Sequence, residues 1–81
     1  MGRVRKGKYR HYKGKMYRVI GVARSSENPK EEMVVYMALY SSKKFGKNQL
    51  WARPREMFAQ KVNVDGKMVP RFRYVGTKDK N

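Results

Sequence analysis

The feature of this chain that most constrains its fold is the alternation of apolar and polar residues, whose period is about two and not about 3.6. The alternation runs in short segments, and turn-forming stretches such as Lys13-Gly14-Lys15 and Asp65-Gly66 separate them. Short segments of this kind are typical of antiparallel strands joined by tight turns. We therefore expect an all-β fold with strands at residues 9–12, 16–24, 32–40, 49–53, 61–64 and 68–75.

Three positions predict where these strands bend or stop. Gly21 lies in the middle of an otherwise regular strand and predicts a bulge, and Pro70 marks an edge or a bulge. Pro54 has no amide hydrogen for a ladder and suits the start of a helix, so residues 54–58 are expected to form one helical turn. The economical architecture is a small, strongly bent antiparallel sheet closed into an SH3-like barrel of about five or six short strands. An open meander is the alternative.

The charge of the chain predicts a polyanionic partner. Lys and Arg number 21 against 6 Asp and Glu, which gives a formal net charge of +15. Self-repulsion of this size destabilises a compact state unless a partner neutralises it. DNA and RNA are the commonest such partners, because Lys and Arg displace counterions from their phosphates.

The hydrophobic content of 40% and aromatic content of 12% still exceed what a disordered chain carries. We therefore expect one folded domain at residues 9–75, a flexible basic arm at residues 1–8 and a loose tail at residues 76–81.

Several classes of function lack the residues they need. The chain has no cysteine, which removes disulfides and thiolate metal sites and favours a cytoplasmic location. No segment approaches the roughly 20 apolar residues of a membrane-spanning helix. The single histidine, His11, is interpreted as a strand residue hydrogen-bonded to backbone or solvent. We expect no enzyme activity, metal or cofactor, because catalysis and metal binding need several such groups to converge.

Basic residues interleaved with aromatic residues predict the binding surface. Strand alternation places the cations around Tyr9, Tyr17 and Phe72 on one side of a sheet and much of the aromatic surface on the other. The alternative is a solvated basic face without a ligand. The residues expected to contact phosphates are Arg3, Arg5, Lys6, Lys8, Arg10, Lys13, Lys15, Arg18, Lys43, Lys44 and Lys47.

A second candidate site is the segment that contains Trp51 and Arg53. Both side chains point to the same face of a strand, and an aromatic ring beside a guanidinium is a platform on which a base can stack. The alternative is that Trp51, Met57 and Phe58 belong to the core while Arg53 pairs with Glu56 to fix the turn.

Four motifs carry a resemblance to a known family. In chain order they are Y-R-H-Y-K-G at residues 9–14, V-V-Y-M-A-L-Y at 34–40, W-A-R-P-R-E-M-F at 51–58 and V-D-G-K-M-V-P-R-F at 64–72. The chain resembles small bacterial and phage proteins catalogued as a numbered domain of unknown function, with the pattern G-x-Y-x-H-[FY]-K-G, V-V-Y-x-x-L-Y, W-x-R-P-x-x-M-F and V-x-D-G-x-x-V-P-R-F. The resemblance covers about residues 8–74 and implies a compact β fold with no established activity. The high positive charge departs from that family, so it indicates a property of this chain.

The function expected from the sequence is binding of nucleic acid, through contacts to the phosphate backbone with little base specificity. RNA and DNA, single-stranded and double-stranded, all remain open. The alternatives are a protein-interaction module that docks on an acidic partner, and a small-ligand or modified-base pocket around His11, Tyr36, Trp51 and Arg53.

Overall fold

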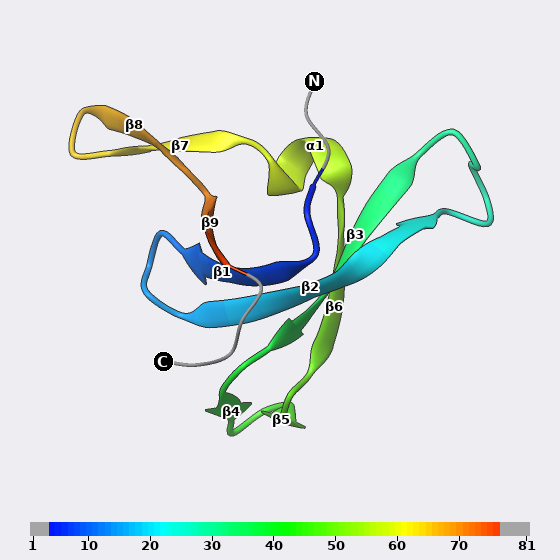
Figure 1. The fold of residues 1–81 in the computed structure, drawn as a ribbon, viewed down its shortest axis with the longest axis horizontal. Coiled ribbons are helices and arrows are strands. Elements are labelled where there is room, and N and C mark those ends of the chain that lie inside the picture. The colour runs from blue at the N-terminus through cyan, green and yellow to red at the C-terminus, as the bar shows by residue number, and fades with distance from the viewer. Residues whose placement is uncertain (1–3, 77–81) are drawn as a thin grey trace.

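The computed structural model describes residues 4–76, and one antiparallel sheet of five strands dominates it (Figure 1). The order across the sheet is β6-β3-β2-β1-β9. Two short hairpins and one helical turn complete the fold. The elements are β1 Gly7–His11, β2 Met16–Arg24, β3 Glu32–Ala38, β4 Ser41–Ser42, β5 Gly46–Lys47, β6 Leu50–Pro54, α1 Arg55–Phe58, β7 Lys61–Val64, β8 Lys67–Pro70 and β9 Phe72–Gly76.

The all-β prediction is confirmed, but the predicted closed barrel is wrong. Strands β6 and β9 form the two edges of the sheet and do not pair with each other in the described part of the chain. Between them the chain runs through α1 and the β7–β8 hairpin (Figure 1). The predicted strand at residues 68–75 is two strands, because the chain leaves the ladder after Pro70 and the Arg71 N–H donates to the Gln60 carbonyl at 3.0 Å.

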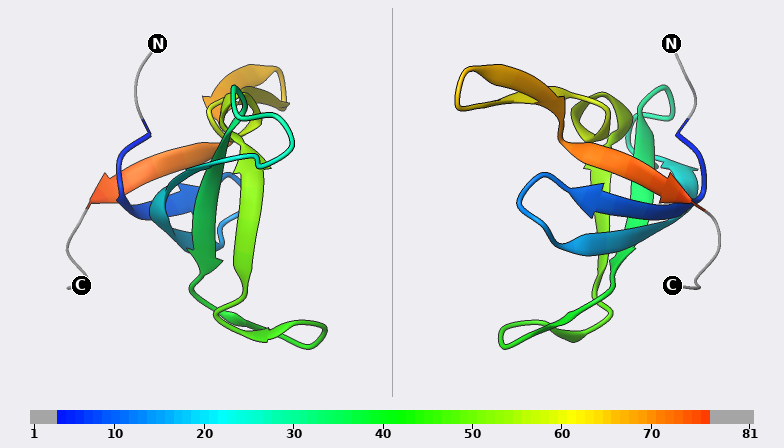
Figure 2. Two further views of the ribbon diagram at one scale, coloured as in Figure 1. Left: turned by 90° about the vertical axis from the view of Figure 1, so that its right-hand side faces the viewer. Right: turned by 60° about the vertical axis from the view of Figure 1, so that its left-hand side comes forward.

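Two bulges bend the sheet. The register between β2 and β3 shifts between Val19 and Gly21, which confirms the bulge predicted at the glycine. The register between β1 and β9 shifts between Lys8 and Tyr9. Bulges increase the local twist, and Figure 2 shows β1 and β9 running across the direction of β3 and β6. The sheet therefore has a concave inner face and a convex outer face.

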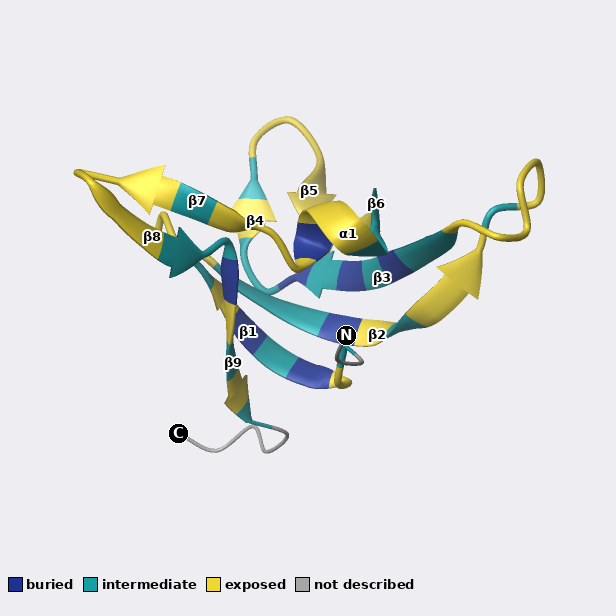
Figure 3. Ribbon diagram, turned by 90° about the horizontal axis from the view of Figure 1, so that it is seen from above, coloured by how far each residue is buried: buried dark blue, intermediate teal, exposed yellow. Residues whose placement is uncertain are grey.

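The core covers the inner face. Its buried cluster consists of Tyr9, Val19, Val34, Tyr36, Phe58 and Phe72. Figure 3 shows the buried positions along β1 and β3 and in the α1 turn that lies over the sheet. The Phe58 and Phe72 rings stack with centroids 4.2 Å apart, so the helical turn packs against β9, the last strand of the chain.

The helical turn was predicted at the right place, but only one of its two apolar residues is core. Phe58 is 2% exposed, whereas Met57 is 45% exposed. Neighbouring residues of a helix point about 100° apart, so a single turn cannot direct both side chains onto the sheet. The described residues contain no helix that is long and apolar enough to cross a membrane.

Candidate nucleic-acid interface

The outer face of β9, β1 and β2 carries basic side chains. The residues that alternate with them, Tyr9, Tyr17 and Phe72, point to the core, so Lys8, Arg10, Arg18 and Arg73 lie on the opposite side. The cations oppose one another across the ladders, Lys8 opposite Arg18 and Arg10 opposite Arg73. No Asp or Glu occurs in these three strands. Like charges placed directly opposite each other destabilise a sheet, so this face favours a bound anion.

A hollow of about 410 Å³ continues this face between the β1–β2 turn and the β7–β8 hairpin. We call it the turn hollow. Arg10, Lys13 and Arg73 line it together with apolar side chains of the β7–β8 hairpin, and its lining includes no carboxylate. The same two arginines therefore belong to the outer face and to the turn hollow, and both sites favour an anion.

His11 lies at the edge of the turn hollow and supports its shape. Its Nδ1 accepts a hydrogen bond from the Lys13 N–H at 3.1 Å, and its ring packs edge-on against Phe72. Burial lowers the pKa of His11, and the charges of Arg53, Arg71 and Lys13 lower it further. This residue is therefore neutral at pH 7, and its interpretation as a strand residue bonded to backbone is confirmed.

Part of the predicted arm, from Arg5 to Lys8, is held against the sheet. β1 begins at Gly7, so Gly7 and Lys8 belong to the sheet, and the first strand starts two residues before its predicted start at residue 9. The Tyr9 hydroxyl accepts from the Arg5 N–H at 3.1 Å and donates to the Arg5 carbonyl at 2.9 Å. The Arg5 guanidinium lies 4.6 Å from the centre of the Tyr74 ring. Lys6 is exposed, and Arg3 lies outside the described residues.

The remaining predicted lysines lie elsewhere. Lys43, Lys44 and Lys47 are exposed on the β4–β5 hairpin, which extends beyond the end of β3 and β6 (Figure 2). Lys15 reaches the inner side of the sheet, where its Nζ lies 4.6 Å from the centre of the Tyr40 ring. The predicted phosphate contacts are therefore divided between two faces of the molecule, and the structure does not unite them in one patch.

Trp51 and Arg53 do share a face, as predicted, and that face is the inner one. They stand opposite Tyr36 and Val34 in the ladder between β6 and β3. With Tyr17, Tyr36 and Tyr40 they line a hollow of about 180 Å³, which we call the inner hollow. Trp51 is 36% exposed, so its assignment to the core is wrong.

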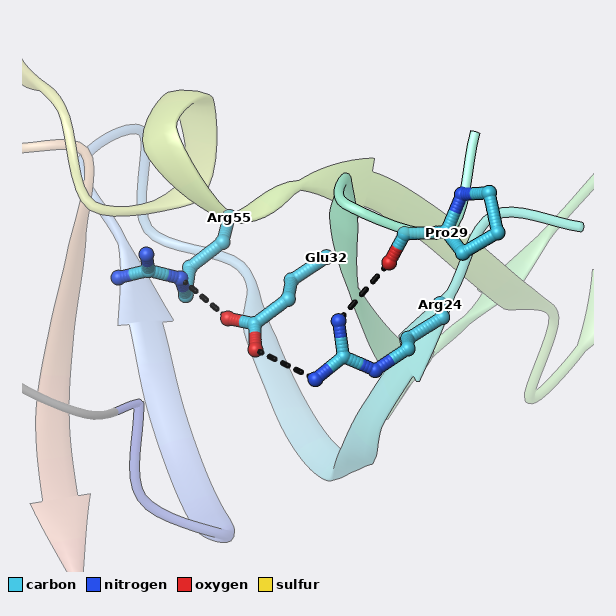
Figure 4. A network of polar contacts seen from close by, with 4 residues as sticks. All are labelled: Arg24, Pro29, Glu32 and Arg55. Carbon is cyan, nitrogen blue, oxygen red and sulfur yellow. Dashed lines mark hydrogen bonds and ion pairs between the residues drawn. The ribbon is translucent and has the colours of Figure 1, made fainter. Parts of the chain in front are cut away.

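The predicted pair between Arg53 and Glu56 is also wrong. The Arg53 Nε donates to the Tyr36 hydroxyl at 3.2 Å. The carboxylate that fixes the helical turn is Glu32 at the start of β3, whose oxygen lies 2.7 Å from the Arg55 Nε (Figure 4). The other oxygen of Glu32 lies 3.8 Å from Arg24. The ion pair at the helical turn is made by Arg55, so the terminal nitrogens of Arg53 remain available to a ligand in the inner hollow.

Sequence reasoning missed Tyr17 and Tyr40 as members of the inner hollow. Their hydroxyls share a hydrogen bond of 2.6 Å, although Tyr17 belongs to β2 and Tyr40 lies between β3 and β4. Burial and the bond to Tyr40 raise the pKa of Tyr17, against a smaller opposing effect of Arg53, so this hydroxyl stays protonated at neutral pH. The signal available in the sequence was the period of two, which places Tyr17 on the same side as Val19, and Tyr36, Ala38 and Tyr40 on one side of the next segment.

Four of the five acidic residues in the described part of the chain lie away from the basic face, and the fifth, Asp65, lies in the β7–β8 turn. Glu27 and Glu31 lie in the β2–β3 loop, Glu32 begins β3 and Glu56 lies on α1. In Figure 1 this loop is at the right, whereas the β1–β2 turn is at the left. The glutamates therefore lie at the end of β2 opposite the turn hollow.

Comparisons with known proteins agree with this fold and assign no activity. The family model described as "Protein of unknown function (DUF1653)" matches residues 7–74. The crystal structure of a protein of that family from Bordetella bronchiseptica superimposes with a TM-score of 0.82 at 35% sequence identity, and the match covers 96% of this chain and 95% of that one. No curated protein matches the chain. The chain belongs to the DUF1653 family of proteins of unknown function.

Proposed function

We propose that this protein binds nucleic acid through phosphate contacts on the outer face of β9, β1 and β2. The observation that carries the proposal is the cross-strand pairing of Arg10 with Arg73. Neither guanidinium has a carboxylate partner among the described residues. A polyanion laid over this pair would convert its repulsion into two attractive contacts. The turn hollow extends the contact surface with Lys13.

The fold also supports the expectation of little base specificity. The grooves of a duplex are usually read by a helix or a two-stranded ribbon that enters the major groove. The helix in the described part of this chain is α1, which has four residues and packs on the core through Phe58, and the proposed surface is the face of a five-stranded sheet, which is broader than a two-stranded ribbon. Contacts from the outer face therefore fall on the backbone of the ligand. The SH3-like closure expected from the sequence is not needed for this mode, and a cytoplasmic location suits it.

The test is a titration of labelled single-stranded RNA, single-stranded DNA and duplex DNA over a range of salt concentrations. The slope of log K against log salt is near −0.9 per neutralised phosphate for a duplex and about −0.7 for a single strand. The double variant Arg10→Gln with Arg73→Gln should flatten this slope by about two contacts. The matched control, Lys30→Gln with Lys61→Gln, removes the same charge from exposed positions outside the outer face and the turn hollow.

Equal losses in the two double variants would mean that net charge, and not this surface, controls binding. Failure of the wild-type protein to bind any of the three polymers at physiological salt would remove the proposal altogether.

A second candidate function is docking on an acidic protein. The observation that favours it is the set of exposed apolar side chains that share the outer face with the cations. They include Ile20, Leu50 and Val75, which are 46%, 55% and 55% exposed. Such residues beside charges are typical of protein contacts. The variants Ile20→Ser and Leu50→Ser separate the two functions, because they would weaken an acidic protein partner and leave the salt slope for nucleic acid unchanged.

A further inference from the structure

The inner face contains a second concave region that the outer face does not explain. The inner hollow, with Arg53 in its lining, adjoins another hollow of about 390 Å³ that Lys43, Lys44 and Phe45 line. We call the second one the rim hollow. Tyr40 and Trp51 line both. The two hollows are therefore neighbours, with a guanidinium in the lining of one and two ammonium groups in the lining of the other.

The walls of this site are aromatic. The rings of Tyr17 and Tyr36 meet edge-on with centroids 5.3 Å apart, and Tyr17 meets Tyr40 in the same way at 5.5 Å. On the other side the Phe45 ring packs edge-on against Trp51 at 5.1 Å and leaves the indole partly exposed. Aromatic walls of this kind stack on a planar ring, and a nucleobase is the planar ring that a protein of this charge would meet.

Charge excludes the other usual ligand of an aromatic cage. Tyrosine and tryptophan cages commonly bind quaternary ammonium groups. Here Arg53 lies in the wall, and Lys15 lies over Tyr40, so a cation would be repelled. The occupant must be neutral or anionic where it meets these groups.

The free nitrogens of the Arg53 side chain favour a base that presents two adjacent hydrogen-bond acceptors. Its Nε is engaged by the Tyr36 hydroxyl, while its two terminal nitrogens have no acceptor and no carboxylate among the described residues. A planar guanidinium pairs best with two adjacent acceptors, and guanine presents O6 and N7 side by side. Adenine places a donor beside N7, so it would set a donor against the arginine.

We infer that these two neighbouring hollows together bind a single guanine nucleotide. The base stacks between Trp51 and the tyrosines with its O6 and N7 toward Arg53, and the phosphate lies in the rim hollow near Lys43 and Lys44. The inference deepens the proposed function, since an unpaired guanine in a nucleic-acid strand is the natural form of such a ligand. It concerns the opposite face of the sheet and can be tested without a polymer.

The experiment is a fluorescence titration with GMP, AMP, CMP and UMP at a salt concentration that suppresses purely electrostatic contacts. Trp51 is the only tryptophan of the chain, so quenching reports on the site directly. We expect saturable quenching by GMP and weaker binding of the other three nucleotides. Arg53→Gln should weaken GMP by roughly 5- to 150-fold, the range for loss of a bidentate contact to a base, and should abolish the preference.

Three further variants test the guanidinium, the two lysines and a control position separately. Arg53→Lys keeps the charge and loses the planar pair, so it should also lose the preference for guanine. Lys43→Ala with Lys44→Ala should weaken GMP and leave guanosine unchanged. Lys30→Gln, at an exposed position that lines neither hollow, should change neither ligand. The unfolding transition of each variant shows that it is folded.

Equal quenching by all four nucleotides, or an Arg53→Gln protein that still prefers GMP, would overturn the inference. GMP binding in a protein that fails to bind polymers would leave the inference intact and refute the proposed function. Polymer binding without any GMP binding would do the reverse.

Discussion

Reversal of one charge on the outer face should make the protein more stable and a weaker binder at the same time. Arg73 stands directly opposite Arg10, and both are exposed arginines. Arg73→Glu turns a repulsive cross-strand pair into an attractive one. An opposite-charge pair contributes roughly 0.2–1 kcal/mol relative to a neutral pair, and relief of the repulsion adds a similar amount, for a total of about 1 kcal/mol.

For a domain of this size, about 1 kcal/mol corresponds to a rise of roughly 4–8 °C in Tm. The rise should shrink at high salt, because exposed charges are screened. Affinity for duplex DNA should fall, and the slope of log K against log salt should flatten by about 0.9 for each lost phosphate contact. Thermal unfolding and binding are measured on the same preparations at two salt concentrations.

The matched control is Lys30→Glu, which makes the same charge change beside Glu31 and Glu32. It should lower Tm slightly and reduce affinity much less than Arg73→Glu. The reasoning is refuted if Arg73→Glu lowers Tm at low salt, because the like-charge pair would then carry no strain. It is also refuted if the two variants lose the same affinity, because position on the outer face would then have no influence.

Three further predictions concern the fold. Phe58→Ala should lower the free energy of unfolding by about 3–5 kcal/mol and unfold much of the protein at room temperature. Met57→Ala in the same turn should leave the free energy of unfolding almost unchanged, because that side chain is exposed. Chemical denaturation of the two variants measures both effects. The pKa of His11 is below its usual 6.5 in the folded protein, so the unfolded state binds more protons below pH 6.5. The free energy of unfolding should therefore fall as the pH drops from 6.5 through the folded pKa, and should not depend on this group above pH 6.5. His11→Gln should remove this pH dependence from the urea midpoint. Gly66 has a φ of 87° in the β7–β8 turn, so Gly66→Ala should destabilise by about 1 kcal/mol although the added methyl group meets no atom within 4 Å.

The local features of the fold were predictable from the sequence. The boundaries of β2 and β7, the bulge at Gly21 and the turn at Asp65-Gly66 all follow from residues close together in the chain. Asp65 and Gly66 both have positive φ, which is the backbone that a tight hairpin of this composition requires. Such features depend on the steric preferences of residues that are close together in the chain, so they can be predicted from the sequence alone.

The features that were predicted wrongly depend on contacts between segments that are distant in the chain. Closure of the barrel needs a pairing of β6 with β9, and no local pattern reports whether the curvature brings those edges together. The ion pair at the helical turn was expected from the local spacing of Arg53 and Glu56, but the partners are Arg55 and Glu32. The inner hollow combines tyrosines that are 23 residues apart, so the alternating pattern could place them on a face but not beside one another.

One structural element connects the two proposed sites, and it predicts which polymer can occupy both. Within the β1–β2 turn, Lys13 lines the turn hollow while Lys15 reaches Tyr40, which lines the inner hollow. A ligand bound to both faces must therefore bend around this turn within a few nucleotides. Duplex DNA has a persistence length of about 150 base pairs and cannot do so, whereas a single strand can.

Single strands that contain guanine should consequently quench Trp51 and show a salt slope, whereas a duplex of the same sequence should show the slope without the quenching. Substitution of Lys15 by Ala should weaken the single strand more than the duplex, because only the single strand passes this point. Quenching of Trp51 by the duplex to the same extent would mean that the two faces do not act as separate sites.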